Sequence, residues 1–109
     1  MKAILVLLLC LPVTQSKIYV ADKNHNLGNA QQIATLNKAC PEIKIIADSK
    51  DADLIVVWDS KTWNETTWAG HQQEFVIYNP AGEVVSSGMS HKISNAAKDI
   101  CKAIIKHKQ

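Results

Sequence analysis

The amino-acid sequence predicts an α+β fold with a single mixed sheet of about five strands and two helices packed on one of its faces. Three observations support this prediction. Short runs rich in strand-forming residues recur along the chain, two segments have helical periodicity, and a pair of cysteines falls in those two helical segments. We therefore expect one exported domain over 17–109, preceded by a signal peptide over 1–16.

The first sixteen residues have the layout of a secretory signal peptide. Lys2 supplies a positive charge, Ala3–Val13 is an apolar run, and Ser16 is a small residue at the expected cleavage position. The run is too short to span a bilayer as a helix. A lipoprotein signal ending at Cys10 is the alternative, but leucine precedes that cysteine where a small residue is required. We expect a mature chain that begins near Lys17 and is secreted or periplasmic, with no transmembrane segment.

The first half of the mature chain alternates between strand and helix patterns. Lys17–Ala21 predicts the first strand, because it alternates and is rich in strand-forming residues. Asn29 is expected to cap a helix that ends at Cys40, since the following proline cannot continue it. Two further strands are expected at Ile43–Ala47 and Leu54–Trp58. The second of them is continuously apolar, which is typical of a central strand.

The second half predicts a loop, a hairpin and a closing helix. Ser60–His71 has no clean period and is expected to be a loop. The turn Asn79–Gly82 then joins two strands, Gln73–Tyr78 and Glu83–Ser87. The final helix is expected to start from a cap at Ser94 or Asn95. Its apolar positions recur at helical spacing, with lysines on the opposite side. The expected order of elements is β-α-β-β-β-β-α.

Cys40 and Cys101 predict one disulfide, because an even pair of cysteines in an exported domain is usually bonded. The enclosed loop is long, so the chain-entropy estimate for the bond is about 4 kcal/mol. Metal or redox chemistry is the alternative, but the pair lacks the Cys-x-x-Cys spacing. Both cysteines fall on the apolar sides of their helices. The helices are therefore expected side by side on one face of the sheet.

The opposite face of the sheet is the expected binding surface, because two helices cover only one face. If Ile55 and Val57 point toward the helices, alternation sends an aromatic set to the other face. An uncovered apolar and aromatic surface usually marks an interaction site. Alternatively, the loop 60–71 folds back and covers it. The predicted binding face consists of Tyr19, Trp58, Tyr78, Trp63 and Trp68.

Charge and motifs exclude several classes of function. The net charge is +2 and every basic residue is a lysine, so the arginine fork that reads guanine or phosphate is missing and no nucleic-acid partner is expected. Gly88-Met89-Ser90-His91 begins like a nucleophile elbow but lacks the second glycine. The four histidines lack the spacing of a metal site. We expect no cofactor, no metal and no catalytic residue.

Three segments together resemble small exported bacterial α/β domains of uncharacterised function. They are Asp51–Val57 entering a strand, Tyr78–Val85 forming a hairpin, and Ser94–Ile100 opening a helix. More distantly, this succession is similar to the amino-terminal domain of TolB-like periplasmic proteins. The resemblance implies an accessory or binding role in the periplasm without catalysis, and it transfers no functional residue.

These observations favour a small exported, non-catalytic binding or accessory protein of the bacterial cell envelope. Its partner would be another envelope protein or a second copy of the chain, and the tryptophans leave a glycan possible. One alternative is an inhibitor or immunity-type protein that blocks an envelope enzyme with the loop Ser60–His71. A small hydrolase or metal-dependent enzyme is the other.

Overall fold

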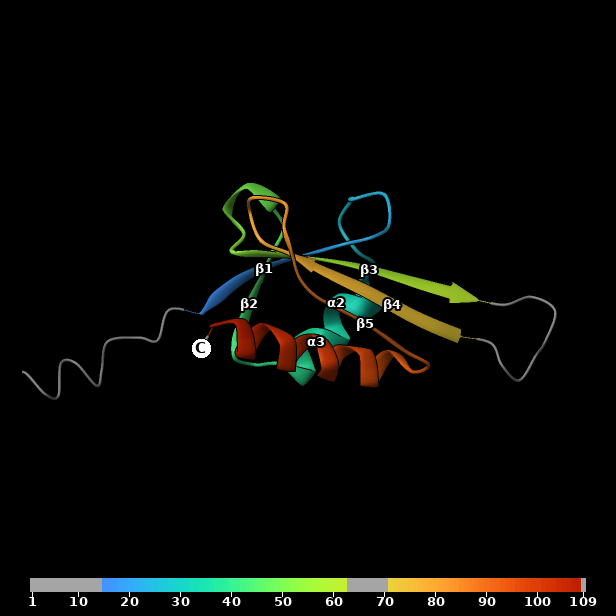
Figure 1. Cartoon of the computed structure of the whole chain (residues 1–109). Coiled ribbons are helices and arrows are strands. Elements are labelled where there is room, and N and C mark those ends of the chain that lie inside the picture. The colour runs from blue at the N-terminus through green and yellow to red at the C-terminus, as the bar shows by residue number, and fades with distance from the viewer. Residues whose placement is uncertain (1–14, 63–70, 109) are drawn as a thin grey trace, which may run out of the picture.

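The computed structural model describes residues 15–62 and 71–108. The elements in these ranges are β1 (Ser16–Ala21), α2 (Ala30–Ala39), β2 (Ile43–Ile46), the short 3₁₀ helix η1 (Ser49–Asp51), β3 (Leu54–Thr62), β4 (His71–Tyr78), β5 (Val84–Ser90) and α3 (Ile93–Lys108). The strands form one sheet in the order β2-β1-β3-β4-β5. The predicted α+β fold is confirmed, with five strands and both helices on one side of the sheet (Figure 1).

The sheet has a parallel half and an antiparallel half. β1 pairs in parallel with β2 and β3, while β3, β4 and β5 pair antiparallel. Parallel neighbours need a crossover connection, and α2 supplies it between β1 and β2. The apolar run of β3 takes the central place in the sheet, as its sequence predicts.

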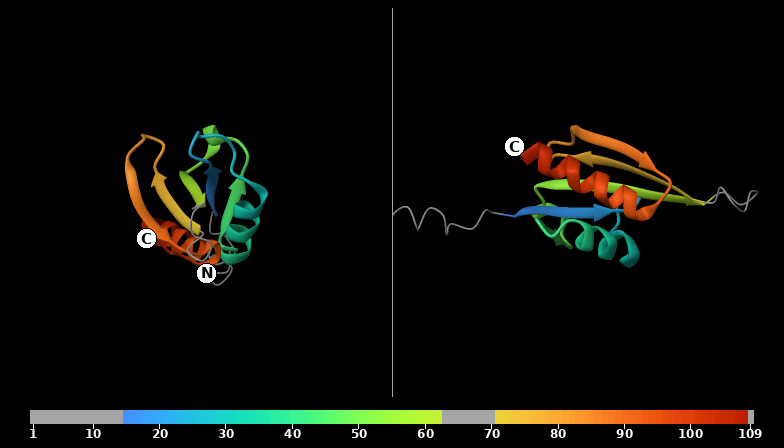
Figure 2. Two further views of the ribbon diagram at one scale, coloured as in Figure 1. Left: turned by 90° about the vertical axis from the view of Figure 1, so that its right-hand side faces the viewer. Right: turned by 90° about the horizontal axis from the view of Figure 1, so that it is seen from below.

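The two helices cover different halves of one face of the sheet. α2 packs over the half that contains β2 and α3 over the half that contains β4 and β5 (Figure 2). The core between helices and sheet is a single apolar cluster drawn from β1 to β4 and both helices, with the partly buried Val85 of β5 packed against it. Its largest fully buried members are Trp58, Ile18, Leu36, Ile77, Ile100 and Ile104.

The expected cap of α2 is confirmed and that of α3 is wrong. The side chain of Asn29 accepts a hydrogen bond of 2.8 Å from the amide of Gln32, which satisfies a free donor of the first turn. α3 begins at Ile93, so Ser94 and Asn95 lie inside its first turn. The amide of Ala96 donates to the carbonyl of Lys92, so the first turn forms directly after Lys92, and Ile93 packs against the core.

β3 and β4 are longer than predicted. Residues 60–62 and 71–72 belong to strands, with Lys61 aligned to Gln72 and Thr62 to His71. These residues are too polar to give a strand pattern, and backbone pairing across the hairpin extends the strands instead. Residues 63–70 of the expected loop lie outside the described ranges.

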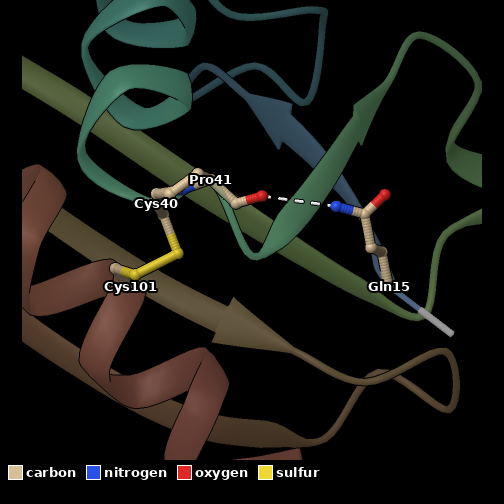
Figure 3. Close-up of a disulfide and its surroundings, with 4 residues drawn as sticks. All are labelled: Gln15, Cys40, Pro41 and Cys101. Carbon is tan, nitrogen blue, oxygen red and sulfur yellow. Dashed lines mark hydrogen bonds between the residues drawn. A yellow bond between two sulfur atoms is a disulfide. The ribbon is translucent and has the colours of Figure 1, made fainter. Parts of the chain in front are cut away.

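The predicted disulfide joins Cys40 to Cys101 with a Cα–Cα distance of 5.5 Å (Figure 3). Cys40 is the residue that ends α2, and Cys101 lies on the buried side of α3. The bond therefore ties the two helices side by side beneath the sheet, as expected. The carbonyl of Pro41, next to the bridge, accepts a hydrogen bond from the side-chain amide of Gln15.

The amino-terminal expectations fall mostly outside the described residues, because residues 1–14 of the expected signal peptide are among those not described. β1 starts at Ser16, one residue before the expected mature terminus. In the described part of the chain, no helix combines the length and apolar character needed to cross a membrane.

Candidate binding site

The alternation of β3 places Trp58 on the helix side of the sheet, so its predicted place on the open face is wrong. Trp58 is fully buried in the core beneath the helices, together with Val56. Ile55 and Val57 point to the other face, opposite to the prediction. The error comes from a single step of register, because a shift by one residue exchanges the two faces of a strand. The assignments made for β1 and β4 are correct.

A chain of buried polar groups explains why the helix side accepts an indole. The Nε1 of Trp58 donates to Oε1 of Gln73 at 2.8 Å, and Nε2 of Gln73 donates to Oγ of Ser60. The carbonyl of Trp58 accepts from Nε2 of Gln32. Gln32 and Gln73 are the two buried polar side chains among the described residues. Their hydrogen bonds offset the cost of removing these amides from water.

The other face of the sheet, here called the outer face, carries its own smaller apolar layer. Tyr19 lies there as predicted, but only 8% of it is exposed. It forms a second cluster with Ala21 and Ala52, and Ala52 follows directly after η1. Part of the face is thus covered by the chain around η1, which rises on the side away from the helices (Figure 1).

Beside this cluster the outer face holds a small hollow of about 290 Å³. Its floor contains Ile55 and Tyr78, which are aligned neighbours on β3 and β4 and are both half-buried. The volume is near the lower limit of ligand pockets, which run from about 300 to 1,000 Å³. Such a space fits one ring or one bulky side chain. The lining consists of His25, Ile55, Tyr78, Asn79, Pro80 and Gly82.

One wall of the hollow is the loop over residues 22–28. The carboxylate of Asp22 accepts hydrogen bonds from the amides of Asn24 and Asn26, at 2.8 and 3.0 Å. The amide of His25 donates to the carbonyl of Asp22. His25 has a φ of +65°, the left-handed region that favours glycine. The turn therefore holds an exposed imidazole at the rim at some cost in backbone energy.

The other wall is the β4–β5 turn, whose prediction over Asn79–Gly82 is confirmed. Three hydrogen bonds join Asn79 and Glu83. The amide of Asn79 donates to the carbonyl of Glu83, and the amide of Glu83 donates to Oδ1 of Asn79. The side-chain Nδ2 of Asn79 also donates to Oε1 of Glu83. Gly82 has a φ of +86°, where glycine carries no steric cost. Because hydrogen bonds fix both walls, the hollow is already formed before a partner binds, which lowers the entropy cost of binding.

A second, more polar cleft of about 550 Å³ lies on the helix side near the start of α3. It brings His91 together with Ser60 and Gln73. However, Oγ of Ser60 accepts from Gln73, and no hydrogen bond joins Ser60 to His91 among the described residues. The lining includes no carboxylate to orient the imidazole.

One group of possible metal ligands occurs in the described part of the chain, formed by Cys40, Glu42 and Cys101 within 4.8 Å of one another. Both sulfur atoms are bonded to each other. A metal needs the free thiolate, so this group does not bind a metal while the disulfide is intact.

The structure brings together some of the predicted binding residues and separates others. Tyr19 and Tyr78 lie on the outer face, Trp58 lies beneath the helices, and Trp63 and Trp68 fall outside the described residues. Sequence reasoning missed His25 and Pro80 as lining residues. The dense polar run around His25 predicts a tight turn. The sequence around it does not predict that this turn lies beside the β4–β5 turn, because that contact depends on the tertiary fold.

Comparison with known proteins gives limited similarity. No protein-family model matches the chain, and no curated protein matches it. Among solved structures, the PelC dodecamer from Paraburkholderia phytofirmans is 18% identical over 83% of this chain and 85% of its own, with a TM-score of 0.44. A point variant of that dodecamer gives 16% identity over 83% and 86%, with a TM-score of 0.45. Similarity at this level assigns neither a family nor a function.

Proposed function

We propose that this chain is a small exported binding protein of the bacterial cell envelope, and that it docks a protein partner through the hollow on its outer face. The disulfide supports export, because such bonds persist mainly in oxidising compartments. The signal-like first sixteen residues and the resemblance to TolB-like periplasmic domains point the same way.

The observation that carries the proposal is a preformed apolar hollow with an imidazole held at its rim in the left-handed region. Backbone strain of this kind persists where the surrounding structure fixes it, and it clusters at binding and active sites. Asn or Gly would serve a purely structural turn at lower cost. His25 instead bears the backbone cost that glycine would avoid, and its exposed side chain lies at the rim, where a partner can contact it.

The occupant that best fits the hollow is an aromatic side chain of the partner. The floor of Ile55 and Tyr78 offers apolar and aromatic contact, and Pro80 adds a rigid apolar wall. Buried aromatic anchors that fill such pockets supply much of the energy of protein interfaces. The exposed imidazole of His25 then orients the anchor through a polar contact at the edge.

A titration with N-acetyl-tryptophanamide, followed by amide chemical shifts in NMR, tests the proposal directly. The expected result is a set of shifts confined to the amides of residues 25, 55, 78, 79, 81 and 82 at millimolar probe. Ile55→Thr keeps the branched shape of the floor residue but makes it polar, and should weaken binding. Val57→Thr is the matched control, because Val57 lies on the same strand and face but does not line the hollow.

A second variant, His25→Gly, should weaken binding of the probe without lowering stability. Glycine relieves the left-handed backbone, so the melting temperature should be unchanged or higher, while binding of the probe should weaken. The corresponding control is His91→Gly, which removes an exposed imidazole away from the outer face. Shifts that cluster in the polar cleft near α3, or equal effects of Ile55→Thr and Val57→Thr, would contradict the proposal.

A further inference from the structure

The two edges of the sheet differ in how well they are protected against pairing with another strand. β2 has four residues, carries the exposed Lys44, and begins two residues after Pro41. Short length, lysine and nearby proline are the usual means of blocking an edge. β5 has seven residues, VVSSGMS, with no charge and no proline. Figure 2 shows these strands at opposite edges of the sheet.

β5 is firmly held in place, so its free edge is a fixed template. Val85 packs against the core between sheet and helices. Gly88 lies opposite Phe75, and a Cβ at position 88 would come within 2.6 Å of the phenylalanine ring. The buried ring thus occupies the space above the glycine and keeps the strand close to β4. A rigid, uncharged edge exposes unpaired backbone donors and acceptors along its length.

Apolar side chains accompany this edge on the outer face. Val84 is 60% exposed and Met89 is 58% exposed, and with Leu27 they are the exposed large hydrophobic residues of the described ranges. Val84 aligns with Tyr78, and Met89 aligns with Glu74, two residues that share the outer face of β4. The two apolar side chains therefore stand near opposite ends of one strand and on one face.

We propose that β5 pairs antiparallel with β5 of a second copy of this chain, about a two-fold axis near Ser87. An antiparallel strand meets itself in such an arrangement, so a single edge supplies both halves of the contact. Such an axis aligns Met89 of one copy with residue 85 of the other. Val84 is the next residue along and lies on the same outer face as Met89 because of the β-bulge, so the two side chains come within reach for cross-strand packing. The absence of charge on β5 removes the repulsion that two identical charged edges would suffer. The two sheets become one continuous sheet with both hollows left open.

The test is the mass of the exported chain in solution, measured by sedimentation equilibrium with the disulfide intact. A reversible dimer is expected between about 10 µM and 1 mM. Ser87→Lys places two like charges beside the axis and should raise the dimer dissociation constant by at least about tenfold. Met89→Lys, at an exposed position, serves as a second variant if the first does not fold.

Two matched variants separate edge pairing from a general effect of charge. Ser49→Lys adds the same charge on η1, and Lys44→Ser removes the charge from the other edge strand. Neither should change the dissociation constant of the β5 dimer. A monomer at the highest concentration, or a dimer that Ser87→Lys leaves intact, would overturn the proposal. A dimer strengthened by Lys44→Ser would place the contact on β2 instead.

Discussion

Single residues on the helix side hold the core together, and Trp58 is the largest of those that are fully buried. Its ring fills the space beneath the helices, and its indole N–H belongs to the chain of hydrogen bonds through Gln73 to Ser60. Packing and polar contacts therefore act at the same residue. A smaller side chain, or an aromatic ring without a donor, should therefore destabilise the core.

Substitutions of Trp58 should separate these two contributions. Trp58→Ala removes the ring from a packed core and should lower the free energy of unfolding by about 3–5 kcal/mol. Trp58→Phe keeps an aromatic ring but leaves Oε1 of Gln73 without its donor, for a loss of about 1–3 kcal/mol. Urea denaturation measures both values. A negligible loss for Trp58→Ala would mean that the side chain lies outside the core.

The backbone nitrogen of Lys17 gives a second prediction at this scale. It donates to Oδ2 of Asp53 at 2.8 Å, while the amide of Asp53 donates to the carbonyl of Lys17. If cleavage follows Ser16, this nitrogen becomes an ammonium group and the contact becomes an ion pair. Asp53→Asn should then cost up to about 1 kcal/mol more in a chain that begins at Lys17 than in one that keeps Ser16.

Thermal unfolding of the two chain lengths, each with and without the substitution, measures this difference. Added salt should reduce it, because the pair is exposed. Asp51→Asn, two residues away on η1, is the control and should affect both lengths equally. Equal losses for Asp53→Asn in the two chains would show that the new terminus does not pair with Asp53.

At the scale of elements, the disulfide and the helices form one unit beneath the sheet. The bridge spans 61 positions of sequence and is buried at both ends. Replacing Cys40 and Cys101 together by serine should lower the free energy of unfolding by about 2–4 kcal/mol, mainly by freeing the unfolded chain. The far-UV circular dichroism of the folded variant should be unchanged.

Denaturation under oxidising and reducing conditions checks that prediction. The unmodified chain should approach the double-serine variant once it is reduced, and the variant itself should not respond to reductant. A reduced chain as stable as the oxidised one would mean that the bridge adds no constraint.

Elements were largely predictable from sequence, because their signals are local. The cap at Asn29, the stop at Pro41 and the Asn79–Gly82 turn each act within a few residues, and all three are confirmed. The start of α3 depended instead on packing of Ile93 against the core. Which side chains of β3 face the helices depends on its pairing with β1. A continuously apolar strand has no alternation of polar and apolar residues from which this could be predicted.

At the scale of the whole molecule, the sheet divides the protein into two sides with different roles. The helix side holds the main core and the disulfide, while the outer side holds the small cluster around Tyr19 and the hollow beside it. The two-sided plan follows from the number of helices, and it was predictable. The hollow was not, because two turns more than fifty residues apart in sequence build its walls.

The most direct test of docking on the outer face is site-specific photo-crosslinking in cells that export the protein. A benzophenone side chain replaces Tyr78 in one version and the exposed Lys102 of α3 in another. Docking through the hollow predicts a discrete adduct with a different protein from position 78, reduced by Ile55→Thr and retained with Val57→Thr. An adduct from position 102 with none from position 78, or one that Ile55→Thr leaves unchanged, would contradict it.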